Sequence, residues 1–356
     1  SMHFIVDGIV TWINEEHPYV ESDFAELLSG QKCEITKWDD IVKIKERFPH
    51  KPPTKDSIAS IMYTSGKTRH PKGCVMTHGN FIATASSFKY VYPFSEKDTI
   101  ISFLPLAHSY EEVIHYVIMH TGIRVGFYSG SVSRLIEEIK ILQPTLLVSV
   151  ARVFERVYEA MQNQISKKPF ITRMAFNTAF SVKSFFTRKF GIQHVPILDS
   201  VFGGVNKAAV GGNMKLFICG GSALSVEVQH FLRIALNVCF VQGYGLTETA
   251  SGVTVQKYTD TLDGNVGVLL HCVQGKMKDL PDMGYFASNF EGELYVKGAT
   301  LFQGYYQDDE KTKEVFDEDG WFKTGDIFKL TKTGQFQIIG RAKELVKLSQ
   351  GEYISL

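Results

Sequence analysis

From about residue 57 to residue 242, the chain alternates short apolar runs with longer amphipathic stretches. The short runs are rich in β-branched and aromatic residues, which is typical of buried strands. They cover residues 58–63, 99–103, 145–150, 215–219 and 238–241. The stretches between them have apolar residues at helical spacing and cover residues 110–120, 132–142, 151–164 and 225–236. This alternation predicts an α/β fold, with parallel sheet covered by helices on both faces.

After about residue 249 the pattern changes to short alternating strands with frequent glycine and aspartate. Three such strands are predicted at residues 293–296, 321–324 and 335–339. They predict a small antiparallel β unit that follows the larger body. The chain stops at Leu356, directly after residues 351–355, which resemble the start of another element. We therefore expect a protein shortened at this end.

Residues 166–194 form a predicted helical segment with no acidic residue. Its cations are Lys167, Lys168, Arg173, Lys183, Arg188 and Lys189. A helical wheel predicts a core-facing side made of Ile171, Met174, Ala175, Thr178, Val182, Phe185 and Phe186. The other side carries Arg173, Asn177, Lys183 and Ser184 together with Phe176 and Phe180. Two phenylalanines among cations on an outward face indicate either contact with an anionic membrane or cover by another protein segment or subunit.

Charge and composition narrow the class of protein. The 38 basic residues balance 38 acidic ones, which argues against a nucleic-acid binder, because phosphate contacts need a net basic surface. At roughly 150 residues per domain, the 356 residues predict two domains or one domain with an appendage. No window approaches the roughly 20 apolar residues of a transmembrane helix. The five widely spaced cysteines indicate reduced thiols of a cytosol-facing protein: Cys33, Cys74, Cys219, Cys239 and Cys272.

The first apolar run leads directly into residues 63–73, Tyr-Thr-Ser-Gly-Lys-Thr-Arg-His-Pro-Lys-Gly. Hydroxyl groups, glycines and cations after a buried strand can converge on an anion such as a triphosphate. The Walker A pattern fails, because its second glycine would fall on Pro71. On its own, the segment fits an anion-binding loop and an ordinary surface turn equally well.

This loop resembles the phosphate-binding signature of the adenylate-forming superfamily of acyl-CoA synthetases, adenylation domains and luciferases. Further resemblances follow in the family order at residues 104–111, 220–223, 242–249, 320–326 and 340–344. Residues 104–108, Leu-Pro-Leu-Ala-His, are most similar to the long-chain fatty acid–CoA ligase branch. The resemblance covers nearly all of the chain from about Trp38 onward.

The chain also departs from the family pattern. It has Lys67, Thr68 and Arg69 where the family has Thr-Thr-Gly, and the lost glycine removes a conformationally permissive position. The family's amino-terminal part is absent, as is most of its carboxy-terminal lid domain with the lid lysine. The resemblance implies an adenylation domain at residues 1–339 and a hinge with a lid stub at residues 340–356. We therefore expect this chain to be poorly active alone.

The reaction implied by the resemblance joins a long-chain fatty acid to coenzyme A through an acyl-adenylate, using ATP and Mg²⁺. A fatty carboxylate is ionised at neutral pH, so its activation needs positioning and charge neutralisation rather than a general base. By resemblance, Thr64, Ser65, Gly66, Thr68 and Lys72 would hold the β- and γ-phosphates. Such an enzyme would lie on the cytoplasmic side, peripheral on an intracellular membrane, and its oligomeric state is left open.

The remaining site residues are assigned by the same resemblance. The segment Gln242, Gly243, Tyr244 and Gly245 would contact the nucleotide, with Tyr244 stacked on adenine between its flanking glycines. Thr247 would donate to the α-phosphate, and Glu248 would bind Mg²⁺.

Gly220, Gly221 and Ser222 would border the adenine, or form an ordinary turn in which Ser222 or Ser225 caps the next helix. Asp326 would accept the ribose hydroxyls, with Arg341 near the ribose and phosphate and Lys343 at the hinge of the lid. His108 would lie near the carboxylate and the pantetheine channel, although a lone histidine there is more often a residue that starts a helix.

Two alternatives stay open for the function. One is another acid-adenylating ligase of the same fold. The other is a catalytically silent nucleotide or acyl-CoA binding protein, which the altered phosphate loop favours. A serine hydrolase is more distant, because Ser222 lacks the Gly-x-Ser-x-Gly elbow.

Overall fold

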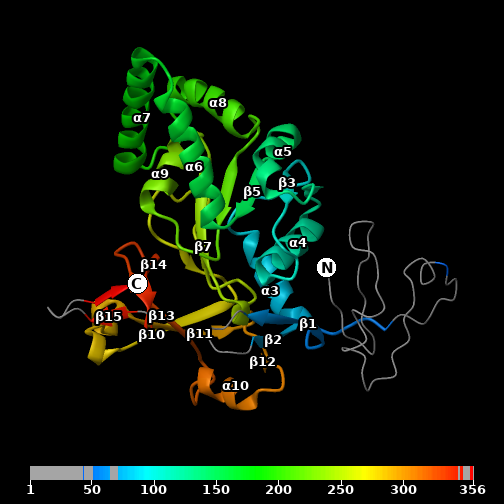
Figure 1. Cartoon of the computed structure of the whole chain (residues 1–356). Coiled ribbons are helices and arrows are strands. Elements are labelled where there is room, and N and C mark those ends of the chain that lie inside the picture. The colour runs from blue at the N-terminus through cyan, green and yellow to red at the C-terminus, as the bar shows by residue number, and fades with distance from the viewer. Residues whose placement is uncertain (1–42, 44–50, 65–70, 344, 348–352, 356) are drawn as a thin grey trace, which may run out of the picture. The chain divides into compact units, whose positions relative to one another are not determined.

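The structure is a computed structural model that describes residues 43, 51–64, 71–343, 345–347 and 353–355. The chain divides into two compact units, residues 1–53 and 54–356. All helices and strands described below belong to the second unit (Figure 1).

The largest sheet in the described part of the chain has seven strands. In spatial order these are β4 (Arg124–Phe127), β3 (Thr99–Ser102), β5 (Leu146–Ser149), β6 (Leu216–Cys219), β7 (Cys239–Tyr244), β8 (Thr254–Val255) and β9 (Val268–Leu269). The strands from β4 to β7 are parallel, and β8 and β9 join antiparallel at one edge. The predicted strands near residues 99, 145, 215 and 238 are therefore confirmed as a parallel sheet.

Helices cover both faces of this sheet, as the strand–helix alternation predicts. Alternate residues of the central strands enter two different cores: in β5, Leu146 and Val148 join one, whereas Leu147 joins the other. The first core includes residues of α3 (His78–Phe88) and α4 (Ser109–Thr121). The second includes residues of α5 (Leu135–Leu142), α6 (Ala151–Ser166), α8 (Pro196–Val210) and α9 (Val226–Ala235). A strand that is buried on both faces needs a continuous apolar run, which explains its sequence pattern.

The first predicted strand does not belong to the parallel sheet, so this part of the prediction is wrong. β1 (Ile58–Thr64) pairs antiparallel with β2 (Lys72–Thr77), whose other edge pairs with β12 (Gly304–Tyr305). Thr64 is the register partner of Lys72, so the segment between them is a hairpin connection. A connection of this length closes a hairpin, whereas a parallel partner would need a crossover of about a dozen residues or more.

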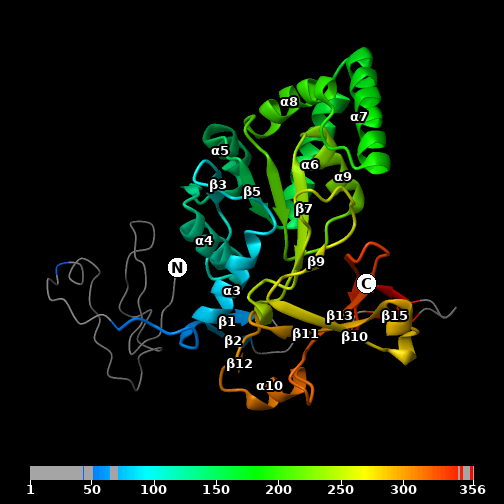
Figure 2. The ribbon, with the colours of Figure 1, turned by 180° about the vertical axis from the view of Figure 1, so that it is seen from behind.

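The predicted antiparallel unit is confirmed as a four-stranded sheet. Its spatial order is β10 (Val273–Lys278), β11 (Glu291–Gly298), β13 (Phe322–Leu330) and β14 (Phe336–Arg341). The short helix α10 (Asp309–Val315) lies between β12 and β13 in the chain, and β15 (Leu345–Lys347) pairs with β16 (Tyr353–Ser355). Figures 1 and 2 both place the antiparallel sheets at the opposite end of this unit from α7 (Phe170–Phe190) and α8.

Helix α7 has the opposite orientation from the one predicted. Phe176 and Phe180 face inward, with ring centroids 6.4 and 5.5 Å from that of Phe231 on α9. Lys183 is 1% exposed and donates to Asp199 at 2.6 Å. The side predicted to pack against the core is outward instead, with Ile171 74% and Phe185 52% exposed.

Both sides of α7 carry large apolar residues, so a helical wheel alone could not choose between them. The contacts with α8 and α9 determine which side faces inward. Lys183 hydrogen-bonds to Asp199 and Ser184 to His230, which lowers the cost of burying these polar groups. Within the described residues, no helix combines the length and hydropathy needed to cross a bilayer.

Candidate functional site

The predicted site residues that the structure describes lie mainly on β7 and in the loops that follow β3, β6 and β7. His108 comes after β3, residues 220–222 follow β6, and residues 243–247 span the end of β7 and its loop. Because these strands are parallel, their carboxyl ends meet at one edge of the sheet, where α/β folds bind ligands. This edge is called the carboxyl edge below.

The loop after β7 is held in a demanding backbone conformation. A side chain at Gly245 would collide with the backbone of Ser251, so only glycine fits there. Ala250 and Ser251 have φ values of 45° and 57°, in the left-handed region that non-glycine residues rarely adopt. The hydroxyl of Ser251 hydrogen-bonds to that of Ser109 at the start of α4. Residues in such sparsely populated backbone conformations cluster at functional sites, and Thr247 and Glu248 lie in the turn directly before them.

The turn after β6 has a comparable restriction. A Cβ atom at Gly220 would lie 3.1 Å from the ring of Tyr110, and Gly221 has a φ of +77°. Ser222 is exposed, whereas Ser225 caps α9 by accepting a hydrogen bond from the Val228 N–H at 3.2 Å. The capping role therefore belongs to Ser225 and not to Ser222.

Gln242 contributes to the core rather than to the surface of the site. It is 5% exposed, and its Nε2 donates to Gln229 Oε1 at 2.7 Å. Its backbone N–H donates to Gln256 Oε1 at 2.8 Å. The side chain of Gln242 thus belongs to a buried amide network. The residues that follow it are better placed for the predicted contact with a nucleotide.

Tyr244, Asp326 and Arg341 form one cluster that joins β7 to the antiparallel sheet. The Tyr244 hydroxyl donates to Asp326 Oδ2, and Arg341 Nε lies 3.2 Å from Asp326 Oδ1. Asp326 and Arg341 are register partners on β13 and β14, which explains their contact. Burial, and then the charge of Asp326, raises the pKa of Tyr244 well above its usual value, so the phenol keeps its proton. The residues predicted for adenine and ribose therefore hold each other.

A second cluster joins Lys72, Tyr305 and Glu248. The Tyr305 hydroxyl donates to Glu248 Oε1 at 2.7 Å, and Lys72 Nζ lies 5.0 Å from the centre of the Tyr305 ring. Tyr305 is 6% exposed, and burial followed by the charge of Glu248 raises the pKa of its phenol. The predicted phosphate lysine and the predicted metal ligand are thus linked by a tyrosine that the sequence patterns did not single out.

The phosphate loop is only partly described. Thr64 is half-buried, and its Oγ1 donates to the Lys72 carbonyl at 3.5 Å. Ser65, Gly66 and Thr68, like Lys67 and Arg69, lie outside the described residues.

Glu248 fits one kind of metal site better than another. In the described part of the chain, no three histidine, cysteine, aspartate or glutamate side chains gather as a cage of metal ligands. One half-buried carboxylate, with Tyr305 on one of its oxygens, fits a Mg²⁺ ion whose other ligands are phosphate oxygens and water.

His108 is the N-cap of α4, as expected for a histidine that starts a helix. Its Nδ1 accepts a hydrogen bond from the Tyr110 N–H at 3.2 Å, and burial lowers the pKa of its ring. A neutral imidazole that accepts at Nδ1 carries its proton on Nε2, so His108 can donate one hydrogen bond. Lys343 is exposed just after β14, where the Ala342 N–H donates to the Gly325 carbonyl at 2.9 Å.

Comparison with known proteins agrees with the family that the motifs indicate. Residues 10–306 match the family described as AMP-binding enzyme. The chain belongs to this family. The match starts at residue 10, well before Trp38, where the motif resemblance began.

Two curated relatives align with most of this chain. Fatty acyl-CoA synthetase B of Dictyostelium discoideum is 38% identical over an alignment of 336 residues that covers 90% of this chain and 48% of that protein. Long-chain-fatty-acid–CoA ligase 1 of Homo sapiens is 37% identical over 336 residues, covering 92% of this chain and 48% of that protein. The chain therefore spans about half the length of these relatives.

Solved structures share the fold. The adenylation domain of a carboxylic acid reductase from Segniliparus rugosus, bound to AMP and a co-purified carboxylic acid, has a TM-score of 0.67 and 25% identity, covering 94% of this chain and 50% of that one. ATP-bound MatB from Rhodopseudomonas palustris has a TM-score of 0.66 and 24% identity, covering 89% of this chain and 54% of that one.

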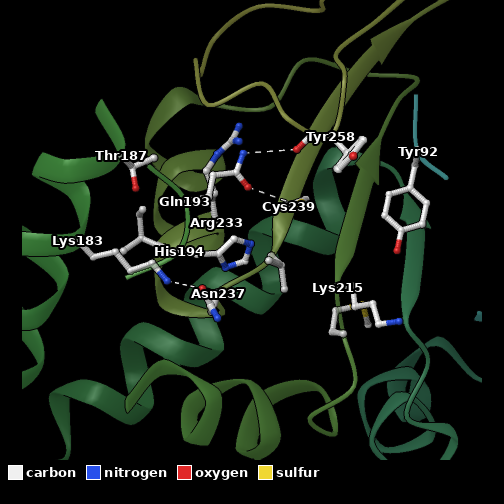
Figure 3. A pocket seen from close by; sticks show the side chains of 13 residues that line it. Tyr92, Lys183, Thr187, Gln193, His194, Lys215, Arg233, Asn237, Cys239 and Tyr258 are labelled. Carbon is white, nitrogen blue, oxygen red and sulfur yellow. Dashed lines mark hydrogen bonds between the residues drawn. The ribbon is translucent and has the colours of Figure 1, made fainter. Parts of the chain in front are cut away.

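A cavity of about 280 Å³ lies elsewhere in the described part of the chain, at the amino ends of β6 and β7 (Figure 3). Lys183, His194, Lys215 and Arg233 line it, but none of the predicted site residues does. Its buried cations already have partners: Lys183 pairs with Asp199, and Arg233 Nη2 lies 3.1 Å from an oxygen of Asp263. The cavity is therefore separate from the predicted nucleotide site.

Proposed function

We propose that this protein activates a long-chain fatty acid with ATP and transfers the acyl group to coenzyme A. The observation that carries the proposal is the pair of clusters around Asp326 and Glu248. Each holds a carboxylate at the nucleotide end of the fold through a hydroxyl donor that a ligand can replace. The names of the curated relatives support the fatty acid as substrate and coenzyme A as acceptor.

In the first half-reaction, a carboxylate oxygen attacks the α-phosphorus of ATP, and the bond to pyrophosphate breaks. Thr247 would donate to the α-phosphate, and the ammonium of Lys72 would neutralise charge on the leaving pyrophosphate. Asp326 would exchange the Tyr244 hydroxyl for the ribose hydroxyls. His108 would use its Nε2 proton to orient a carboxylate oxygen, because its lowered pKa favours the neutral ring at physiological pH.

In the second half-reaction, the coenzyme A thiol loses its proton to solvent, its sulfur forms a bond to the acyl carbon, and the bond from that carbon to the phosphate oxygen of AMP breaks. Lys343, exposed directly after β14, would lie at the hinge about which a lid domain turns between the two half-reactions. Glu248 would hold Mg²⁺, which when bound supplies further charge neutralisation at the phosphates.

The test is pyrophosphate release by the full-length protein with ATP, Mg²⁺ and palmitate, followed by acyl-CoA formation when coenzyme A is added. Octanoate and benzoate in place of palmitate separate a long-chain ligase from another acid-adenylating ligase. ATP binding by calorimetry without any pyrophosphate release, for any of the acids, would identify a silent nucleotide binder and overturn the proposal.

We also propose that the reaction takes place on the cytoplasmic side of an intracellular membrane. The free thiols of Cys74, Cys219, Cys239 and Cys272 suit a reducing compartment, and the proposed substrate is a lipid. Protease protection of the protein on sealed membrane fractions tests this: digestion without detergent is expected, and protection would contradict it.

A further inference from the structure

Helix α7 presents an apolar side to the solvent. Phe170, Ile171, Met174, Val182 and Phe185 are 70%, 74%, 54%, 42% and 52% exposed. We call these five residues the outer face of α7. In Figures 1 and 2, α7 lies at the margin of the fold, with its partners α8 and α9 on one side only. A cluster of large exposed side chains on one helix is unusual for a surface that meets only water.

Cations flank this face, and acids are missing from it. Residues 160–198 contain no aspartate or glutamate. Lys167 and Lys168 precede the helix, and Arg188 and Lys189 end it; all four are exposed. Lys189 Nζ lies 5.3 Å from the centre of the Phe185 ring, so charge and apolar surface are adjacent.

We propose that the outer face of α7 docks on an anionic lipid bilayer, with its apolar side chains in the headgroup region and the four cations on lipid phosphates. Lipid offers both chemistries at once: an apolar interior for phenylalanine and isoleucine, and a negative surface for lysine and arginine. A second copy of the chain fits less well, because a symmetric contact would bring the same cations together. The proposal deepens the proposed function by adding a place where a fatty acid is collected.

The surface differs from the one that the sequence suggested. The sequence predicts that Phe176 and Phe180 insert, but they pack inside, and the ring centres of Phe176 and Phe202 are 5.8 Å apart. Substituting them would weaken the fold and would not test docking. The informative substitutions are on the outer face, where the side chains have few neighbours to lose.

The experiment is co-sedimentation of the full-length protein with phosphatidylcholine vesicles that contain or lack phosphatidylserine. We expect binding only to the phosphatidylserine vesicles, weakening as salt is added. Phe170→Ser combined with Phe185→Ser should lower the partition coefficient by roughly tenfold or more, and Arg188→Gln combined with Lys189→Gln by roughly tenfold or more.

Matched controls use exposed residues of other elements. Met119→Ser combined with Ile141→Ser removes side chains that are 69% and 73% exposed on α4 and α5. Lys313→Gln combined with Lys332→Gln removes two exposed cations elsewhere. Both controls should bind as the parent does. Phe185→Trp should be quenched by brominated phosphatidylcholine in the anionic vesicles, whereas Ile141→Trp should not.

Three outcomes would overturn the proposal. One is parental binding by both outer-face double variants. Another is absence of vesicle binding by the parent. The third is a parent dimer that the phenylalanine variant dissociates without any vesicle binding, which would assign the face to a second copy. Pyrophosphate release with detergent-dispersed palmitate, measured on the same variants, should stay at the parental rate. If the parent protein released no pyrophosphate, that result would contradict the proposed function but not the docking of α7.

Discussion

The two ends of the large sheet use polar residues in different ways. At the amino ends of β6 and β7, charged groups are buried in closed sets: Arg233 is 3% exposed and contacts Asp263 together with the carbonyls of Asp260 and Phe240. At the carboxyl edge, the carboxylates of Asp326 and Glu248 each accept a hydrogen bond from a tyrosine hydroxyl, and Asp326 also lies 3.2 Å from Arg341, whose side chain is 56% exposed. A closed set of charges stabilises one structure, whereas a single hydroxyl can be exchanged for a ligand. The difference separates permanent pairs from replaceable ones.

The largest expected effect concerns the buried charges at the amino ends of β6 and β7. Arg233→Met should lower the free energy of unfolding by about 3–5 kcal/mol, because it leaves the buried carboxylate of Asp263 without its guanidinium. Urea denaturation measures the change. Lys215→Met, whose side chain is 57% exposed and only 3.8 Å from Asp98, is the control and should change stability by less than about 1 kcal/mol. Similar losses in both variants would remove the distinction.

The next effect concerns Glu248 at the carboxyl edge. Glu248→Gln should reduce the adenylation rate of the full-length protein by about 100-fold, equal to about 2.7 kcal/mol, while stability changes little. The amide keeps the shape of the side chain but loses the charge that Mg²⁺ would need. Pyrophosphate release at saturating ATP is the measurement, and Glu318→Gln on the exposed surface is the control. An unchanged rate would remove Glu248 from the site.

A third prediction concerns pH and Glu112, in the first turn of α4 at the carboxyl edge. Burial raises the pKa of Glu112 to about 7, against a hydrogen bond from Tyr116 that lowers it. The folded protein therefore binds this proton more tightly than the unfolded chain does, and stability falls as pH rises from about 4.5 to about 7.

Glu112→Gln should remove that slope and stabilise the protein by about 2 kcal/mol above pH 7, at about 1.4 kcal/mol per pKa unit with a discount for solvent. Thermal unfolding across the pH range measures it, with Glu137→Gln, an exposed residue of α5, as control. A slope that persists in the Glu112 variant would assign it to other groups.

The smallest effect concerns the link between Lys72 and Glu248. Tyr305→Phe keeps the ring under Lys72 but removes the hydroxyl that positions Glu248, so adenylation should slow by about 3–10-fold, about 1 kcal/mol. The rate loss should depend on Mg²⁺ concentration, whereas a merely structural effect would not. Tyr306→Phe, whose side chain is 46% exposed, should leave the rate unchanged.

The sequence was sufficient for features that are local in the chain. Buried strands such as β5 and β6 need continuous apolar runs, and glycines such as Gly245 occupy positions where no side chain fits, so both leave a visible pattern. Contacts between distant segments leave none. Tyr305 meets Glu248 across 57 residues. The side-chain amide of Gln242 donates to Gln229 and its backbone N–H donates to Gln256, both in other parts of the chain. The orientation of α7 was missed for the same reason, because its neighbours on α8 and α9 decide it.

The contact between Tyr244 and Asp326 has a consequence for selectivity. A ligand that takes the carboxylate of Asp326 must displace a hydroxyl already bound there, so it gains only the difference between two hydrogen bonds. With the ribose role proposed for Asp326, a ribonucleotide would offer two hydroxyls in place of the one that the tyrosine donates. A deoxyribonucleotide would offer only one there, so it would replace the tyrosine hydroxyl without gaining a further hydrogen bond. The hydroxyl of Tyr244 would thus compete with the sugar for Asp326 and favour ribonucleotides over deoxyribonucleotides.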